Sequence, residues 1–207
     1  MTEPTSRETD ATLGALADLV LTSPHNLMSR SARAELLTRH IPECLALARL
    51  LPAGSGRLLD VGSGGGFPGL VIAIERPDLE VHLLDATAKK TDFLRDAAQR
   101  LGCSSVTVHT GRAEDLVRTP LEGTFDLVSA RAVAPLARLL PLTIPFLRPM
   151  GLLYAIKGER WLEELEAATP VLSRVGARVV ATPEDMTVPD DVDDVTMPRV
   201  VMIARDR

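Results

Sequence analysis

From Arg57 onward, short apolar runs alternate with segments whose apolar residues recur at helical spacing, and this alternation restricts the fold more than any other feature of the chain. The apolar runs predict strands at residues 57–61, 80–86, 105–111, 125–131, 152–158, 177–185 and 199–205, with helices at 67–75, 87–102 and 159–176. Strands that alternate with helices form a mostly parallel sheet covered on both faces. The last two strands have no helix between them, so we expect a hairpin that makes one strand antiparallel.

The chain ahead of this pattern is expected to be helical. Residues 31–51 have a Ser at the start and apolar residues at helical spacing, and Pro42 should kink or split the helix. A further apolar segment, residues 135–147, carries Pro141 and Pro145, so a broken helix is expected there. We therefore predict an N-terminal helical segment, residues 1–55, and an α/β domain over residues 56–207 with a Rossmann-like sheet of seven strands.

The net charge says little about binding partners, whereas the cysteine content and the lack of targeting segments indicate the cellular compartment. The formal net charge is -5, yet residues 183–194 hold a run of acids without Lys or Arg, and the remainder is nearly neutral. We expect that acidic run to be a solvated loop. Cys44 and Cys103 are too few and too far apart for a disulfide framework or a zinc cluster, so no metal is expected. With no signal peptide and no membrane-length apolar run, the sequence predicts a cytoplasmic protein.

A glycine-rich stretch, "LLDVGSGGGFPG", follows the first predicted strand and fits two spacings. Gly64, Gly66 and Gly69 give the G-x-G-x-x-G dinucleotide pattern, whereas Gly62, Gly64 and Gly66 give G-x-G-x-G. The strand should end near Val61, which favours the spacing that begins at Gly62. The sixth position of that spacing is Phe67 rather than Gly, which disfavours a tight pyrophosphate loop.

Acidic residues around this loop suggest a ligand with a cationic amine and a ribose. Asp60 lies two positions before Gly62, and Asp85 ends the second strand, where a carboxylate accepts hydrogen bonds from both ribose hydroxyls. After the third strand, "GRAED" brings the backbone at Ala113 and Glu114 to the position of an adenine edge. Together these features predict S-adenosylmethionine as cofactor and the class I methyltransferase fold. A nicotinamide-dependent oxidoreductase is a more distant alternative.

Two methylation chemistries are disfavoured by absent motifs. The fourth strand leads into "SARAVAPL", without the Pro-Pro-aromatic turn typical of enzymes that methylate exocyclic amines. Neither cysteine follows a proline, as a nucleophile for cytosine C5 methylation commonly does. The remaining possibility is an acceptor atom that is already nucleophilic. Guanine N7 is one, because its lone pair needs no prior deprotonation, and methyl transfer to it needs mainly proximity and alignment.

Five stretches then carry a specific resemblance: "DVGSGGGFPG", "LLDATAKKTDFL", "GRAED", "SARAVAPL" and "AIKGER". With Asn26–Leu27 and, fourteen positions after Asn26, His40, they resemble the RsmG family, also called glucose-inhibited division protein B. The resemblance covers residue 24 to the end. It implies transfer of a methyl group to N7 of a guanosine in 16S ribosomal RNA. The sequence departs from the family pattern at "HIPEC", where Glu43 and Cys44 replace Asp and Ser.

The resemblance also implies roles for individual residues. Gly62, Gly64 and Phe67 would line the cofactor loop, and Ala113 and Glu114 would hold adenine. Arg131 would lie beside the methyl donor and the guanine, as cofactor ligand and catalytic residue. The residues implied to contact RNA are Asn26, Arg30, Arg33, Arg39, His40, Lys157 and Arg199.

The acceptor and the setting keep alternatives open. We expect 16S ribosomal RNA within the small ribosomal subunit or its precursor as partner, with no DNA and no membrane. A nearly neutral body favours a substrate presented in an assembled particle over naked RNA. A methyltransferase of another RNA or of a small molecule has the same fold. A cofactor-binding ribosome-associated factor without turnover is the alternative of a different class.

Overall fold

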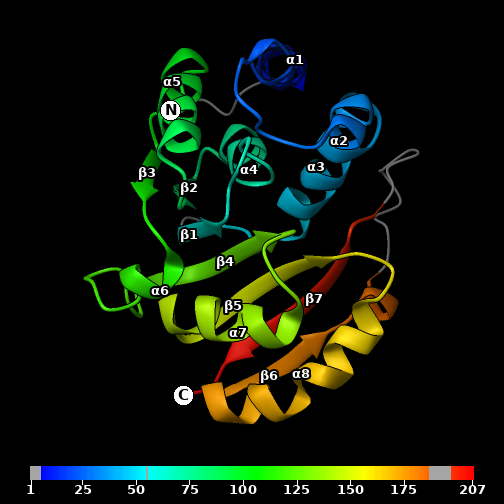
Figure 1. Ribbon diagram of the computed structural model, residues 1–207, viewed down its shortest axis with the longest axis vertical. Helices are drawn as coiled ribbons and strands as arrows, with labels where there is room; N and C mark the ends of the chain where they lie inside the picture. The colour runs from blue at the N-terminus through cyan, green and yellow to red at the C-terminus, as the bar shows by residue number, and fades with distance from the viewer. Residues whose placement is uncertain (1–5, 55, 187–196) are drawn as a thin grey trace.

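The computed structural model describes residues 6–54, 56–186 and 197–207, and a seven-stranded sheet runs through its centre (Figure 1). The strands are β1 Gly56–Val61, β2 Leu79–Asp85, β3 Val106–Thr110, β4 Phe125–Arg131, β5 Leu147–Lys157, β6 Ala177–Ala181 and β7 Arg199–Arg205. Their order is β3-β2-β1-β4-β5-β7-β6, and β7 runs antiparallel to both neighbours. The parallel sheet with its antiparallel C-terminal hairpin confirms the sequence prediction.

The order of strands reverses between β1 and β4, and such a switch point is where ligands bind in open α/β sheets. Val61 of β1 lies opposite Ala130 of β4 in the parallel ladder. Gly62, which follows β1, and Arg131, which ends β4, therefore lie side by side at the carboxyl edge of the sheet.

Helices cover both faces of the sheet. They are α1 Ser6–Thr22, α2 Arg30–Ala34, η1 Leu36–His40, α3 Ile41–Leu50, α4 Gly69–Glu75, α5 Ala88–Arg100, α6 Ala113–Leu116, α7 Leu136–Thr143, η2 Ile144–Phe146, α8 Trp161–Val175 and η3 Pro183–Asp185. Helices α1 to α5 lie on one side of the sheet, and α6, α7 and α8 lie on the other (Figure 1).

Two hydrophobic clusters fill the spaces between sheet and helices. The first joins Leu16 of α1 and Leu47 of α3 to Leu58 and Val81 of the sheet. The second packs α7 and α8 against the opposite face. The N-terminal helices thus share a core with the sheet, and a domain boundary between residues 55 and 56 stays a prediction.

The N-terminal region differs from the sequence prediction in detail. Residues 6–22 form α1, a helix within the predicted helical segment whose bounds the sequence pattern does not give. The single kinked helix expected over residues 31–51 is three pieces, of which η1 is a π-helix, with the amide of His40 bonded to the carbonyl of Glu35. The interruption precedes Pro42, which occupies the first turn of α3, where a missing N–H costs nothing.

The helix after β4 is less broken than predicted. Helix α7 continues through Pro141, and the irregular 3-10 turn η2 begins only at Ile144. Leu136, Leu139 and Leu140 are buried in the second cluster, and this packing outweighs the one hydrogen bond that Pro141 cannot make.

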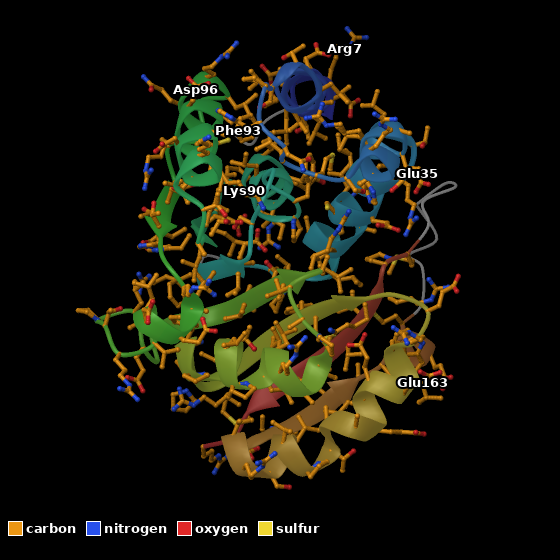
Figure 2. All side chains as sticks on the ribbon, viewed as in Figure 1. Arg7, Glu35, Lys90, Phe93, Asp96 and Glu163 are labelled. Atoms are coloured by element: carbon orange, nitrogen blue, oxygen red, sulfur yellow. The ribbon has the colours of Figure 1, made fainter. Side chains whose placement is uncertain are left out.

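Charged side chains lie on the outer faces of the helices. Arg7, Asp96 and Glu163 project from α1, α5 and α8 (Figure 2) and are exposed. None of the helices in the described ranges combines the length and the hydropathy that a membrane span requires. The expected acidic loop begins with η3, and its residues 187–194 lie outside the described residues.

Candidate functional site

The glycine loop leaves β1 at Val61, as the spacing that begins at Gly62 predicts. The amides of Gly62 and Ser63 both donate to the carbonyl of Leu84, at 2.7 and 3.0 Å, and so tie the loop to β2. Gly62 has a φ of +75°, and a Cβ atom there would lie 2.6 Å from Cγ2 of Val133. Glycine is therefore required here both for backbone conformation and for the close approach of Val133.

Asp60 lies beneath this loop and fastens it. Its Oδ1 accepts a hydrogen bond from the Ser129 hydroxyl at 2.8 Å, and its Oδ2 accepts one from the Gly69 amide at 3.2 Å. The side chain is buried, and burial raises the pKa of Asp60 to about 6. The sequence predicted that Asp60 meets a cofactor amine, but the structure places it outside the cavity residues, as a support for the loop.

Asp85 ends β2 and is buried at the edge of a cavity. Its two oxygens accept hydrogen bonds from the amides of Gly64, at 3.0 Å, and Thr87, at 2.9 Å. Since each carboxylate oxygen has two lone pairs, both retain the capacity to accept a ligand hydroxyl. Lys90 lies 3.9 Å from Oδ2 and adds positive charge on the other side.

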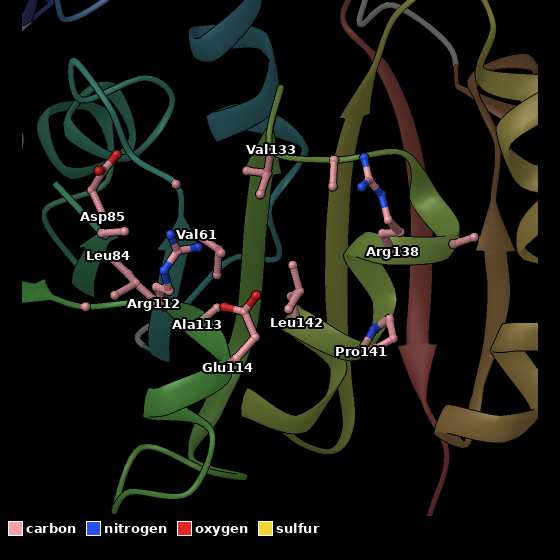
Figure 3. A pocket seen from close by; sticks show the side chains of 15 residues that line it. Val61, Leu84, Asp85, Arg112, Ala113, Glu114, Val133, Arg138, Pro141 and Leu142 are labelled. Atoms are coloured by element: carbon pink, nitrogen blue, oxygen red, sulfur yellow. The ribbon is translucent and has the colours of Figure 1, made fainter.

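The cavity has a volume of about 690 Å³ and opens at the ends of β1 and β2, beside the segments that follow β3 and β4 (Figure 3). Such a volume is typical of a small-molecule site. Four residues that the sequence assigned to the cofactor line it, namely Gly62, Asp85, Ala113 and Glu114. Ala113 is buried at the start of α6, whereas Glu114 is exposed.

Other cofactor predictions fall outside the cavity. Phe67 is buried in the cluster beneath the N-terminal helices, so its ring packs in the core and does not line the cavity. Gly64 contributes through its hydrogen bond to Asp85 and is absent from the lining. Both residues belong to the glycine loop but not to the residues that line the cavity, so a contact of either one with the cofactor stays a prediction.

The sequence does not predict the residues that line the cavity opposite Asp85. Val133, Arg138 and Leu142 line the cavity from α7 and the turn before it (Figure 3). Val133 belongs to the motif "SARAVAPL", but nothing in that motif indicates that its side chain lines a cavity. Arg138 and Leu142 are four residues apart on α7, a spacing that brings them to one face of a helix.

Arg131 ends β4, and its side chain forms a polar cluster, the Arg131 cluster, with His40 of η1 and with Glu43 and Cys44 of α3. One terminal nitrogen donates to Nδ1 of His40, and the other lies 3.6 Å from Sγ of Cys44 and 3.7 Å from Oε2 of Glu43. Burial, and then the charge of Arg131, lower the pKa of His40, which favours a neutral ring that accepts this bond. Burial raises the pKa of Cys44 to about 12, so it is a thiol. Arg131 is not among the cavity residues.

The RNA-facing edge predicted from the sequence is only partly exposed. Asn26, Arg30 and Arg39 are exposed, and Arg39 bonds both Glu35 and Glu43, at 2.8 and 2.9 Å. His40 is buried against Arg131, so its ring cannot form part of an exposed edge, contrary to the prediction. Arg33 is half-buried and donates to the carbonyl of His25 at 3.0 Å.

Lys157 and Arg199, also predicted to contact RNA, differ from each other in exposure. Lys157 has a side chain only 7% exposed, and its Nζ lies 2.8 Å from Glu164 and 2.7 Å from the carbonyl of Ala134. It links β5 to the turn before α7, and contact with a phosphate would require this ion pair to open. Arg199, opposite Lys157 in the ladder, is exposed.

The strand order, the glycine loop under a cavity, and the carboxylate at the end of β2 together define a class I S-adenosylmethionine-dependent methyltransferase. The fold resembles a crystal structure provisionally described as an S-adenosyl-L-methionine-dependent methyltransferase from Methanococcus maripaludis, with a TM-score of 0.63 and 12% identity over 100% of this chain and 98% of that one. It also resembles precorrin-6y C5,15-methyltransferase from Geobacter metallireducens, with a TM-score of 0.53 and 17% identity over 79% of this chain and 88% of that one. At these identities the likeness concerns the fold.

Sequence relatives narrow the class. The chain belongs to the family described as rRNA small subunit methyltransferase G, which it matches over residues 14–188. A relative of that name from Sorangium cellulosum is 48% identical over 76% of this chain and 68% of its own length. Another from Halorhodospira halophila is 49% identical over 68% of this chain and 65% of its own length. The chain thus spans about two thirds of the length of these relatives.

The cavity residues fit S-adenosylmethionine. Asp85 offers a buried carboxylate to ribose hydroxyls, and Gly62 leaves bare backbone where a Cβ would collide with Val133. Leu84, Ala113 and Leu142 supply apolar surface for a purine. A buried carboxylate and an apolar wall of this kind suit the ribose and the purine of the cofactor.

Proposed function

We propose that this protein transfers a methyl group from S-adenosylmethionine to N7 of a guanosine in 16S ribosomal RNA. The observation that carries the proposal is the adjacency of the cofactor loop and Arg131, in a chain of this family. The loop follows Val61 and Arg131 follows Ala130, and these two residues are paired in neighbouring strands. A methyl donor in the cavity and an acceptor base beside Arg131 would then meet at the carboxyl edge of the sheet.

The cavity residues would act by holding the donor. Asp85 would accept hydrogen bonds from the ribose, and Ala113 and Glu114 would border the adenine. Gly62 would let the backbone approach the ligand, while Asp60 would hold the loop from beneath through Gly69 and Ser129. S-adenosylmethionine supplies an electrophilic methyl group when bound.

Arg131 would act on the acceptor. Its guanidinium donates hydrogen bonds, and guanine O6 accepts them, so N7 would remain free to attack the methyl group. No proton has to be removed from N7 before transfer, so alignment accounts for the rate increase without a dedicated base. His40, Glu43 and Cys44 contact Arg131 and would fix its direction.

For the wider setting we propose the small ribosomal subunit or its precursor as substrate, in the cytoplasm, with neither DNA nor a membrane as partner. The exposed side chains Asn26, Arg30, Arg39 and Arg199 would contact the RNA backbone. Arg39 is already held by two carboxylates, so the basic surface is small, which supports presentation of the base by a folded particle.

A methyl-transfer assay on small subunits from a strain lacking the enzyme tests this function, with the modified base identified by mass spectrometry. We expect one new 7-methylguanosine in 16S ribosomal RNA and weaker transfer to protein-free RNA. Guanine-N7 methylation that is unchanged in the deletion strain would contradict the function. Equal transfer to naked RNA would contradict only the particle as substrate.

A further inference from the structure

Glu43 lies in the Arg131 cluster, where it contacts Arg39 as well as Arg131. It stands in the first turn of α3, with its side chain 12% exposed, and Arg131 is 16% exposed. Both groups therefore reach solvent while most of their surface is shielded. A carboxylate in such a place is either a neutralising partner for the nearby guanidinium groups or an acceptor for a ligand.

The two oxygens of Glu43 are in different situations. Oε1 accepts a hydrogen bond from Nε of Arg39 at 2.9 Å. Oε2 lies 3.7 Å from Arg131 and 3.6 Å from Nδ1 of His40, and both distances exceed the usual length of a hydrogen bond. Arg39 thus fixes the carboxylate, and Oε2 keeps lone pairs for a stronger donor.

The groups around Oε2 are themselves held in place. Nδ1 of His40 accepts from Arg131, and the thiol of Cys44 lies beside the other terminal nitrogen of Arg131. A guanidinium nitrogen and a carboxylate oxygen, each held by its neighbours, therefore lie 3.7 Å apart. Such preorganised donor and acceptor pairs favour specificity, because little conformational freedom is lost when a ligand binds.

We propose that Glu43 determines acceptor specificity by accepting hydrogen bonds from N1–H and the exocyclic amine of the target guanine while Arg131 donates to O6. This inference rests on the proposed function. Guanine carries the O6 acceptor next to the N1–H donor, which matches a guanidinium beside a carboxylate. Adenine has the reverse arrangement and would offer Oε2 of Glu43 an acceptor, N1, in place of a donor, which costs binding energy. N7 lies outside both contacts and stays free.

An internal competition between two acceptors tests the proposal. Small subunits are reconstituted with guanosine or with inosine, which lacks the exocyclic amine, at the target position, and mixed in equal amounts. Mass spectrometry gives the ratio of 7-methylguanosine to 7-methylinosine even at low turnover. For the wild type we expect about tenfold preference for guanosine, as one hydrogen bond to a charged group predicts.

Two variants and a matched control complete the test. In Glu43→Ala the preference should fall to about twofold or less, whereas Glu43→Asp should retain most of it because a carboxylate remains. Glu35→Ala removes the other carboxylate bound to Arg39, at 2.8 Å, and should keep the wild-type ratio. Thermal melting and binding of S-adenosylhomocysteine confirm that each variant is folded.

The outcomes separate the inference from the function on which it rests. An unchanged preference in folded Glu43→Ala, or equal use of guanosine and inosine by the wild type, overturns the role of Glu43 and leaves the proposed function intact. A wild-type enzyme that makes neither 7-methylguanosine nor 7-methylinosine refutes the proposed function. A loss of preference in Glu35→Ala as well would assign the effect to Arg39 and overturn the inference.

Discussion

The cofactor cavity and the Arg131 cluster adjoin the same edge of the sheet but are built differently. The cavity is a space of about 690 Å³ shaped by backbone turns after successive strands, with a single buried carboxylate, Asp85. The cluster is a set of side chains in contact, and it joins Arg131 to His40, 91 positions away in the chain. Shape governs the first region and charge governs the second, so changes in them should have separable effects.

The largest expected effect is on acceptor turnover in Arg131→Ala. Loss of one charged donor at a reacting centre typically lowers kcat/KM by about 10²–10³-fold. Arg131 is not among the cavity residues, so the affinity for S-adenosylhomocysteine should change by about twofold or less, the scale of a lost remote contact. Steady-state assays on small subunits and calorimetry measure the two quantities.

Arg148→Ala is the matched control for this variant. Arg148 forms an ion pair with Asp126 at 2.6 Å, on an exposed stretch of β5 away from both regions. It should retain wild-type turnover and affinity. If Arg131→Ala weakened cofactor binding as much as turnover, the two regions would be one functional unit and the comparison would fail.

The next effect concerns the support that both regions share. In Gly69→Ala the new Cβ would lie 2.3 Å from Leu83 and 2.7 Å from Oδ2 of Asp60. Because these neighbours are buried, we expect the free energy of unfolding to fall by about 2–3 kcal/mol. Gly14→Ala is the control, since nothing lies within 4 Å of a Cβ there in α1, and it should stabilise by about 0.5–1 kcal/mol. Urea denaturation measures the free energy of unfolding of both variants. A Gly69→Ala variant as stable as the wild type would refute the tight contact at Gly69.

The same contrast explains what the sequence could predict. Strands and the register of the glycine loop follow from local patterns, since apolar periodicity and strand ends are set within a few residues. The helix predicted over residues 87–102 ends at Gly102, whose φ of +70° is typical of a glycine just past a helix end. Thr87 is the N-cap residue of α5, yet its side chain makes no cap hydrogen bond, while its amide donates to Asp85.

Long-range contacts were beyond reach of the same reasoning. Nothing near His40 in the sequence indicates that its ring is buried against Arg131. Lys157 appears in the sequence as a free cation, whereas the fold brings Glu164 to it. The π-helix η1 was not predicted either, although it orients His40 and the start of α3. Such pairings depend on tertiary packing and not on local propensity.

A smaller effect is expected in the cavity from Asp85→Ala. The change removes the carboxylate proposed to bind ribose and also the acceptor of the Gly64 amide. We expect the affinity for S-adenosylhomocysteine to fall about tenfold, since hydrogen bonds to a charged group contribute about 1.5–3 kcal/mol and water replaces part of the loss. Asp92→Ala, which removes an exposed partner of Arg95, is the control for calorimetry. An unchanged affinity would exclude Asp85 from the cofactor site.

The smallest effect is a difference in pH dependence. Burial and Arg131 lower the pKa of His40 from 6.5, so its neutral form stabilises the fold fully above pH 6.5 and this contribution is lost as the pH falls through the lowered value. Asp60, with a pKa of about 6, titrates nearby, while Glu43 and Arg39 also face His40. His40→Gln retains an acceptor for Arg131 but cannot take up the proton.

Turnover of the wild type on small subunits should therefore fall more steeply than that of His40→Gln between about pH 7.5 and about pH 5.5, by about threefold over that range, because protonated His40 repels Arg131. Asp60 titrates in both proteins and cancels from the comparison. Affinity for S-adenosylhomocysteine, measured over the same range, should change equally in the two, since His40 contacts Arg131 and not the cavity. Identical pH profiles of turnover for the wild type and His40→Gln would show that protonation of His40 does not affect Arg131. Diverging affinities would show that the charge of the cluster reaches the cavity.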